Sequence, residues 1–152
     1  MKAMQKGFTL IELIVVIVIL GILAATALPR FINVATDARM AAMNGMAGGL
    51  RSAVVLAQSR YVATGSTTAT TVNMGLTGAV QAVDVAAGTG IPAATATGIQ
   101  VAMQSIDGFA FACNAGVCTV TQTGSPAACA VTYTGATGVV STAAVIAANC
   151  GG

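Results

Sequence analysis

The chain opens with an apolar run that has neither a helical nor a strand period. The run spans residues 8–28, and its interruptions are Thr9, Glu12, Gly21 and Thr26. Twenty-one residues at the helical rise make roughly 30 Å, which matches the hydrocarbon core of a bilayer. The pattern therefore predicts a helix that crosses a membrane.

Beyond Pro29 the pattern becomes amphipathic. Apolar residues recur at steps of three and four, which places them on one face of a helix. This stripe consists of Met43, Met46, Leu50, Val54, Ala57 and Tyr61. We expect one helix from Phe8 to about Val62, with methionines filling a core against a sheet and Gly65 as a left-handed cap.

The segment after this helix carries weaker signals. Residues 67–78 are polar and rich in Gly and Thr, which predicts a loop. Residues 79–85 alternate weakly and predict a strand. Pro92 suits a first helical turn, so Pro92–Ser105 is expected to form a short helix.

The last third of the chain predicts strands. Residues 109–113 and 118–122 flank a four-residue hairpin loop at 114–117. Residues 128–133 predict another strand, and residues 138–147 supply one or two more. The expected fold class is α+β, with an antiparallel sheet of about four strands on the C-terminal half of the long helix.

Charge and composition exclude several classes of function. The 152 residues hold six Lys and Arg, four Asp and Glu, and no His. No cation lies beyond Arg60, so the basic stripe of a nucleic-acid-binding protein is missing, and no nucleic-acid partner is expected. The second half of the chain offers only Asp84 and Asp107 as acids, which gives no nucleophile–base pair. We expect no enzyme, no cofactor and no metal.

Glu12 is the anomaly of the apolar run, because an ionised carboxylate in a membrane-spanning helix costs about 3 kcal/mol on insertion scales. A secretory signal peptide cleaved after Ala27 does not account for it, and neither does a plain membrane anchor. A third interpretation does. The stretch Lys6-Gly7-Phe8-Thr9-Leu10-Ile11-Glu12-Leu13, with the run that follows, resembles the N-terminus of type IV prepilins and related pseudopilins.

The resemblance implies a processing pathway. Residues 1–7 would be a leader that a prepilin peptidase removes between Gly7 and Phe8, after which the new amine of Phe8 is methylated. Residues 8–29 would form the transmembrane and assembly helix, and residues 30–152 would form an amphipathic helix with a periplasmic head. The subunit would wait in the bacterial inner membrane until an ATP-driven machine moves it into a helical filament.

The resemblance also assigns roles within the helix. Glu12 would pair with the Phe8 amine of a neighbouring subunit, and two such charges about 4 Å apart attract by roughly 4 kcal/mol at an effective dielectric near 20. Gly21 and Pro29 weaken the helix between them, because glycine lowers helix propensity and proline lacks an N–H. In filaments of the family the corresponding segment can lose helicity.

All four cysteines lie in the last forty residues, which suggests disulfides formed in an oxidising compartment. Their spacing lacks the paired short gaps of a zinc site. Of three possible connectivities we favour Cys113–Cys118, across the predicted hairpin, and Cys129–Cys150, which resembles the C-terminal disulfide loop of type IV pilins.

The resemblance implies a structural protein, the type IVa-like major subunit of a pilus. The stretch Ile91–Ile99 further resembles mannose-sensitive haemagglutinin pilins, a branch of the same family. The alternatives are the major pseudopilin of a type II secretion system, which usually lacks paired cysteines, and a minor pilin with an adhesin role. The filament would reach the cell surface and serve in adhesion, surface attachment or motility.

Overall fold

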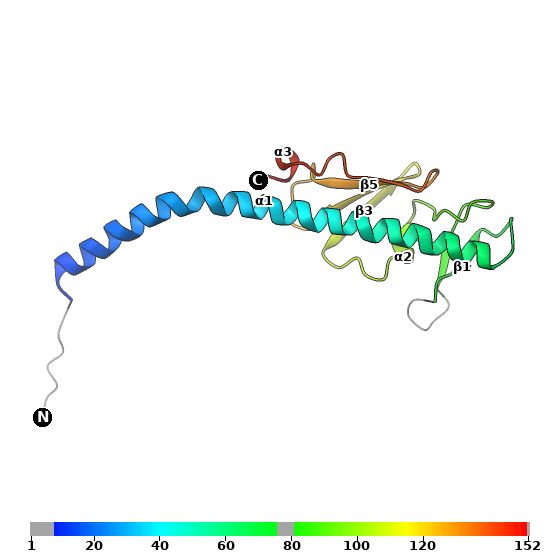
Figure 1. The fold of residues 1–152 in the computed structure, drawn as a ribbon, viewed down its shortest axis with the longest axis horizontal. Helices are drawn as coiled ribbons and strands as arrows, with labels where there is room; N and C mark the ends of the chain where they lie inside the picture. The colour runs from blue at the N-terminus through cyan, green and yellow to red at the C-terminus, as the bar shows by residue number, and fades with distance from the viewer. Residues whose placement is uncertain (1–7, 76–80, 152) are drawn as a thin grey trace, which may run out of the picture.

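One continuous helix, α1 (Leu10–Ala63), runs through more than a third of the chain. The computed structural model describes residues 8–75 and 81–151, with the backbone alone for residues 28–33. Figure 1 shows that the first half of α1 protrudes from the molecule and that its second half lies along a small head. The backbone stays helical through positions 21 and 29, in agreement with the single long helix predicted from the sequence.

The second half of α1 buries the predicted apolar stripe. Each of its six side chains is at most 7% exposed: Met43, Met46, Leu50, Val54, Ala57 and Tyr61. The helix ends where the sequence predicted. Gly65 adopts a φ of +67° just beyond the Thr64 cap, and its N–H donates to the Val62 carbonyl. Both predictions are confirmed.

The head is built on a four-stranded antiparallel sheet in the order β3-β4-β5-β6, which confirms the α+β fold class. Its strands are β3 (Phe109–Asn114), β4 (Val117–Gln122), β5 (Ala130–Thr134) and β6 (Val139–Ser141). One face of this sheet packs on α1 through Val120, Val131 and Tyr133, which are fully buried. In Figure 1 the sheet lies alongside the C-terminal half of the helix.

The hairpin between β3 and β4 is tighter than predicted. Its loop has two residues, Ala115 and Gly116, because Asn114 and Val117 pair with each other as strand residues. Ala115 has φ +48° and Gly116 has φ +80°, the combination of a type I′ turn, whose twist matches the flanking strands. The expectation of a four-residue loop at 114–117 is therefore wrong.

A second sheet has two short strands, β1 (Thr71–Asn73) and β2 (Ala82–Asp84). β2 lies inside the predicted strand at 79–85, whose first two positions fall outside the described residues. β1 lies where a loop was predicted, so that expectation is wrong for residues 71–73. A strand of three residues with one buried side chain, Val72, carries too little periodicity to be found in a sequence.

The predicted helix Pro92–Ser105 is also wrong. Only α2 (Ile99–Ala102) is helical, and Pro92 forms an isolated β-bridge with Val85. Side chains compete with the helix here, because the Thr97 hydroxyl donates to Oδ2 of Asp84 at 2.5 Å. A last short helix, α3 (Ala147–Cys150), begins at residue 147, where the segment predicted as strand ends.

The structure joins Cys113 to Cys118 and Cys129 to Cys150, the pairing favoured from the sequence. The first bond crosses the β3–β4 hairpin between directly opposed residues. The second bond ties α3 to the start of β5, and both of its cysteines are fully buried. Nη1 of Arg39 on α1 donates to the Cys150 carbonyl at 3.0 Å, so this end of the chain is fixed to the long helix.

Candidate functional site

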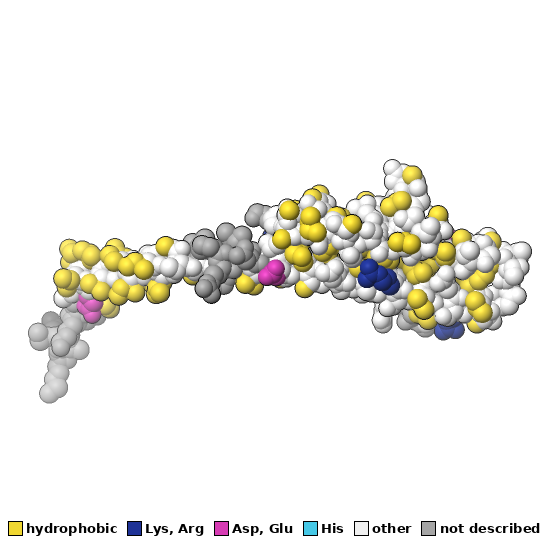
Figure 2. Space-filling model, turned by 45° about the horizontal axis from the view of Figure 1, so that its top comes forward, with side chains coloured by type: hydrophobic (Ala, Val, Ile, Leu, Met, Phe, Trp, Pro, Cys, Tyr) yellow, Lys and Arg dark blue, Asp and Glu magenta, His cyan; other side chains and the backbone are white. Residues whose placement is uncertain are grey.

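The protruding half of α1 is an apolar surface without cover. The segment Leu10–Ala27 has a mean hydropathy of 2.8, and none of it is buried. Leu20 is 57% exposed, whereas Leu50 on the packed half is fully buried. Figure 2 shows hydrophobic side chains covering this half of the helix. By length and composition, it is the single helix in the described part of the chain that could cross a membrane.

Glu12 lies in the first turn of this helix. Thr9 is the N-cap residue, with φ −79° and ψ 149°, and its Oγ1 accepts from the Glu12 N–H at 3.4 Å. The same hydroxyl lies 3.5 Å from Oε2 of Glu12, and it is the one partner that the described residues give the carboxylate. Position 12 also faces the positive end of the helix dipole, which favours a negative charge.

The Thr9–Glu12 contact is a feature that the sequence interpretation missed. Ser or Thr followed three residues later by Glu is the sequence signal of a capping box, and Thr9-x-x-Glu12 fits it. Glu12 is therefore partly a local helix-start residue. The contact is long and solvent-exposed, so it leaves the carboxylate able to bind a cation from elsewhere.

The structure separates the predicted site residues into two groups. Phe8, Glu12 and the backbone at positions 21 and 29 all belong to the N-terminal half of α1 or its start, and Phe8 is 85% exposed. Gly7 lies outside the described residues. The four cysteines lie at the far end of the chain, within the head.

The acids of the head are engaged in local contacts. Asp84 accepts from Thr97, and Oδ2 of Asp107 accepts from the Ser105 hydroxyl at 2.8 Å. Among the described residues, no three His, Cys, Asp or Glu side chains gather where they would hold a metal ion. The described part of the head thus offers packing surfaces and no group of converging charges.

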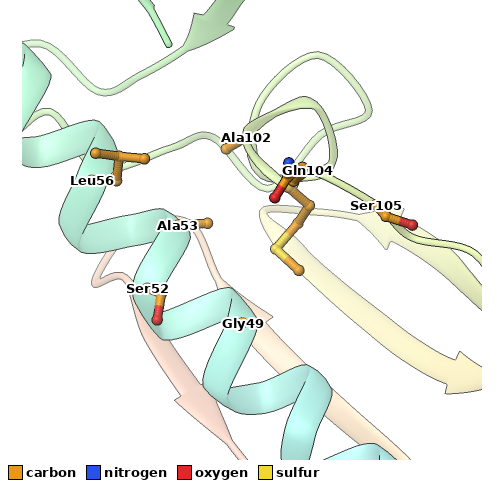
Figure 3. Close-up of a pocket in the computed structure, with 8 residues that line it drawn as sticks. Gly49, Ser52, Ala53, Leu56, Ala102, Gln104 and Ser105 are labelled. Atoms are coloured by element: carbon orange, nitrogen blue, oxygen red, sulfur yellow. The ribbon is translucent and has the colours of Figure 1, made fainter. Parts of the chain in front are cut away.

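A shallow groove of about 440 Å³ lies between α1 and the segment after α2. Figure 3 shows Ser52, Ala53 and Leu56 on the helix facing Ala102 and Gln104 across it. Gly49 opens the floor, where an added Cβ would lie 3.1 Å from the terminal carbon of Met103. No residue lining it titrates near neutral pH, so the groove is suited to packing.

Comparison with known proteins places similarity in the N-terminal third of the chain. Residues 2–28 match the family model described as the prokaryotic N-terminal methylation motif. The chain is 52% identical over 52 residues to the type IV narrow pilus major component PilA5 of Thermus thermophilus, covering 34% of this chain and 45% of the relative.

Two further relatives match over 54 residues each. The fimbrial protein EcpC of Eikenella corrodens is 50% identical over 54 residues, which cover 36% of this chain and 35% of the relative. The type IV major fimbrial protein FimA of Dichelobacter nodosus is 44% identical over 54 residues, with the same two coverages. The matches thus span less than half of each curated relative. No solved structure matches the chain with significance.

Proposed function

Because residues 2–28 match the prokaryotic N-terminal methylation motif and the relatives that the chain resembles are type IV pilus and fimbrial proteins, we propose that the protein is a structural subunit of a type IV pilus. The observation that carries the proposal is the exposed apolar half of α1, which follows a Gly7-Phe8 junction and bears Glu12 near its start. Such a helix suits a protein that is first anchored in a membrane as a single copy and then assembled into a polymer of many copies.

The exposed apolar half has to be covered in the cell. Thirteen large apolar side chains between Phe8 and Leu23 are between 46% and 85% exposed. At roughly 1.5–3 kcal/mol for each side chain removed from water, leaving them in water would cost on the order of 20 kcal/mol. A bilayer covers this surface before assembly, and the same half of neighbouring subunits covers it in a filament.

Processing would convert the membrane-anchored precursor into an assembly unit. A prepilin peptidase removes residues 1–7 and creates a free amine at Phe8, which is then methylated. Residues 8–29 remain as the inner-membrane helix, and residues 30–152 form the external part. The exposure of Phe8 at the start of α1 agrees with a terminus that a peptidase reaches.

Glu12 then acts as the assembly residue. Its side chain is exposed at the start of α1, and the one contact that the described residues make with its carboxylate is the long one from Thr9. Pairing with the Phe8 amine of a neighbouring copy would neutralise two charges inside an apolar bundle and fix the axial position of each subunit. In the filament, the segment between Gly21 and Pro29 would loosen, because glycine and proline hold it less firmly than its neighbours.

The assembly route, location and family branch of the subunit are further parts of the proposal. The subunit would be inserted by the pilus assembly machinery and displayed on the cell surface, where it has a structural role and no enzymatic one. The two disulfides of the head favour a pilin over a secretion pseudopilin. The assignment to the haemagglutinin branch stays a prediction from the Ile91–Ile99 stretch.

A deletion strain complemented with variants tests the proposal. Electron microscopy should show surface filaments with the wild-type gene and none without it. Glu12→Ala should leave the mature N-terminus at Phe8, read by N-terminal sequencing, and lower filament yield by about tenfold or more, since the lost pairing energy acts at every subunit added.

Asp37→Ala is the matched control, because Asp37 is a second exposed acid on the same helix. It should leave filament yield unchanged. Normal filaments in the Glu12→Ala strain would disprove the assembly role of Glu12. A mature protein beginning at Leu28 would disprove the prepilin processing route.

A further inference from the structure

The two edges of the four-stranded sheet differ in how they are protected. β6, at one edge, has three residues, and Nη2 of Arg51 on α1 donates to the Val140 carbonyl at 3.2 Å. β3, at the other edge, has six residues and contains neither a charged residue nor a proline. Natural sheets usually protect long edges with those devices, because an open edge is a template for another strand.

The strand register identifies the free backbone groups of β3. In a hairpin with a two-residue loop, the residues that flank the loop form a hydrogen-bonded pair, so Asn114 bonds to Val117. Alternation along the strand then directs the backbone groups of Ala110 and Ala112 toward β4. The N–H and C=O groups of Phe111 and Cys113 point away from the sheet, and no described residue outside it bonds to them.

We propose that β3 pairs antiparallel with β3 of a second copy of this chain. The pairing places Phe111 opposite Cys113 of the second copy and the reverse, with Ala112 facing its own equivalent at the two-fold axis. The N–H and C=O groups of Phe111 and Cys113 in both copies are then hydrogen-bonded, which makes four hydrogen bonds between the two strands. The side chains of Ala110, Ala112 and Asn114 on the exposed face are small and uncharged, so the strands approach without clash or repulsion.

The symmetry of this pairing decides where it acts. A two-fold axis between antiparallel strands is perpendicular to the sheet, so it reverses the direction of α1, which lies along the sheet in Figure 1. Subunits of one filament point the same way, and β3 therefore cannot pair within it. This part of the inference rests on the proposed function: β3 links subunits of two filaments that run in opposite directions, or of two opposed membranes.

A single pair of six-residue strands is too small for a stable dimer in solution, where standard interfaces bury far more surface. Repetition changes this, because each pair formed holds the next pair of copies at a high effective concentration. The contact is thus expected between arrays of subunits and not between isolated ones. The other edge cannot replace it, because Arg51 already occupies the Val140 carbonyl of β6.

The test uses the full chain reconstituted into vesicles of phosphatidylethanolamine and phosphatidylglycerol, so that it does not depend on filament formation. Wild-type vesicles should cluster, as read by turbidity and electron cryomicroscopy. Ala112→Lys and Ala112→Glu vesicles should each stay separate, because like charges meet at the two-fold axis. Mixing the two variants should restore clustering, which a misfolded head would not do.

Val139→Lys is the matched control, since Val139 is 57% exposed on the protected edge strand, and it should cluster like the wild type. Wild-type vesicles that stay separate would overturn the inference, as would clustering that survives Ala112→Lys. Filaments purified from cells provide the second reading. Their absence alone counts against the proposed function, whereas filaments that form but never associate side by side count against the β3 contact.

Discussion

The two halves of α1 share one backbone and differ in the solvent that their side chains require. The N-terminal half is apolar all round and exposed, whereas the C-terminal half buries one stripe and presents polar residues elsewhere. Leu20 and Leu50 illustrate the contrast, with 57% and 0% exposure in one helix. A uniform apolar surface needs a partner that surrounds it, and an amphipathic surface needs one on a single side. The difference therefore separates the half that we propose assembles from the half that carries the head.

The same substitution should destabilise the head when it is made in the C-terminal half of α1 and leave the head unchanged when it is made in the N-terminal half. Leu50→Ala leaves a cavity in the core and should lower the free energy of unfolding by about 2–5 kcal/mol. Leu20→Ala removes a side chain that touches no part of the head and should leave it unchanged. Thermal unfolding of the detergent-solubilised chain, followed by near-ultraviolet circular dichroism, measures both. An equal loss in the two variants would mean that the halves do not differ as described.

The buried disulfide between Cys129 and Cys150 should contribute a comparable amount to the free energy of unfolding of the head. Replacing Cys129 and Cys150 by serine opens a loop closed across a sequence separation of 21 and should cost about 3 kcal/mol. The same replacement at Cys113 and Cys118 opens a short hairpin loop and should cost about 2 kcal/mol. Denaturant titrations compare the pairs. A larger loss at the hairpin would contradict the loop-closure ranking.

Alkaline pH should lower the stability of the head through ionisation of Tyr133. Burial raises the pKa of Tyr133 to about 12 from its usual 10.0, and its hydroxyl donates to the Pro92 carbonyl at 2.5 Å. Because the folded state holds this proton more tightly, its contribution is complete below pH 10 and is lost as the pH rises toward 12. The loss should not exceed about 3 kcal/mol. Tyr133→Phe should be less stable at neutral pH and should lose less between pH 10 and 12, and an unchanged pH profile would contradict this cause.

The smallest effect concerns the first turn of the exposed half. Thr9→Ala removes the N-cap and should weaken the start of α1 by about 1 kcal/mol. Thr9→Ser keeps the hydroxyl and should behave as the wild type. Amide hydrogen exchange of the first two turns, measured in detergent micelles, should rise in the alanine variant and nowhere in the head. Faster exchange throughout α1 would show that the two halves are not energetically separate.

Short-range helical periodicity made the long helix and its packed face predictable. The stripe from Met43 to Tyr61 and the Gly65 cap come from local rules that the head does not override. The segment from Pro92 to Ser105 is shaped by contacts that its periodicity does not show. Thr97 bonds to Asp84, and the backbone at Gly98 lies so close to Ala93 that an added Cβ would be 2.1 Å from the Ala93 carbonyl oxygen. Contacts between distant residues decide such segments, and a single sequence does not display them.

The N-terminal part of the candidate site was predictable from the sequence. The apolar run and Glu12 are visible in the sequence because they break ordinary composition. The Thr9 contact also has a sequence signal, because Thr9 and Glu12 have the spacing of a capping box. The open edge of β3 was not predictable, since it depends on the order of the strands in the sheet, which no local pattern of residues encodes.

The two arginines that hold the head to α1 bind carbonyl oxygens. Arg39 donates to the Cys150 carbonyl and Arg51 to the Val140 carbonyl, and both bonds are partly buried. A carboxylate partner would take up a proton in acid and release the arginine, whereas a peptide oxygen carries no titratable proton at such pH values. Salt also screens ion pairs at the surface, whereas hydrogen bonds to uncharged carbonyl oxygens are less affected by salt. The attachment of the head to α1 is thus chemically suited to acidic or saline surroundings.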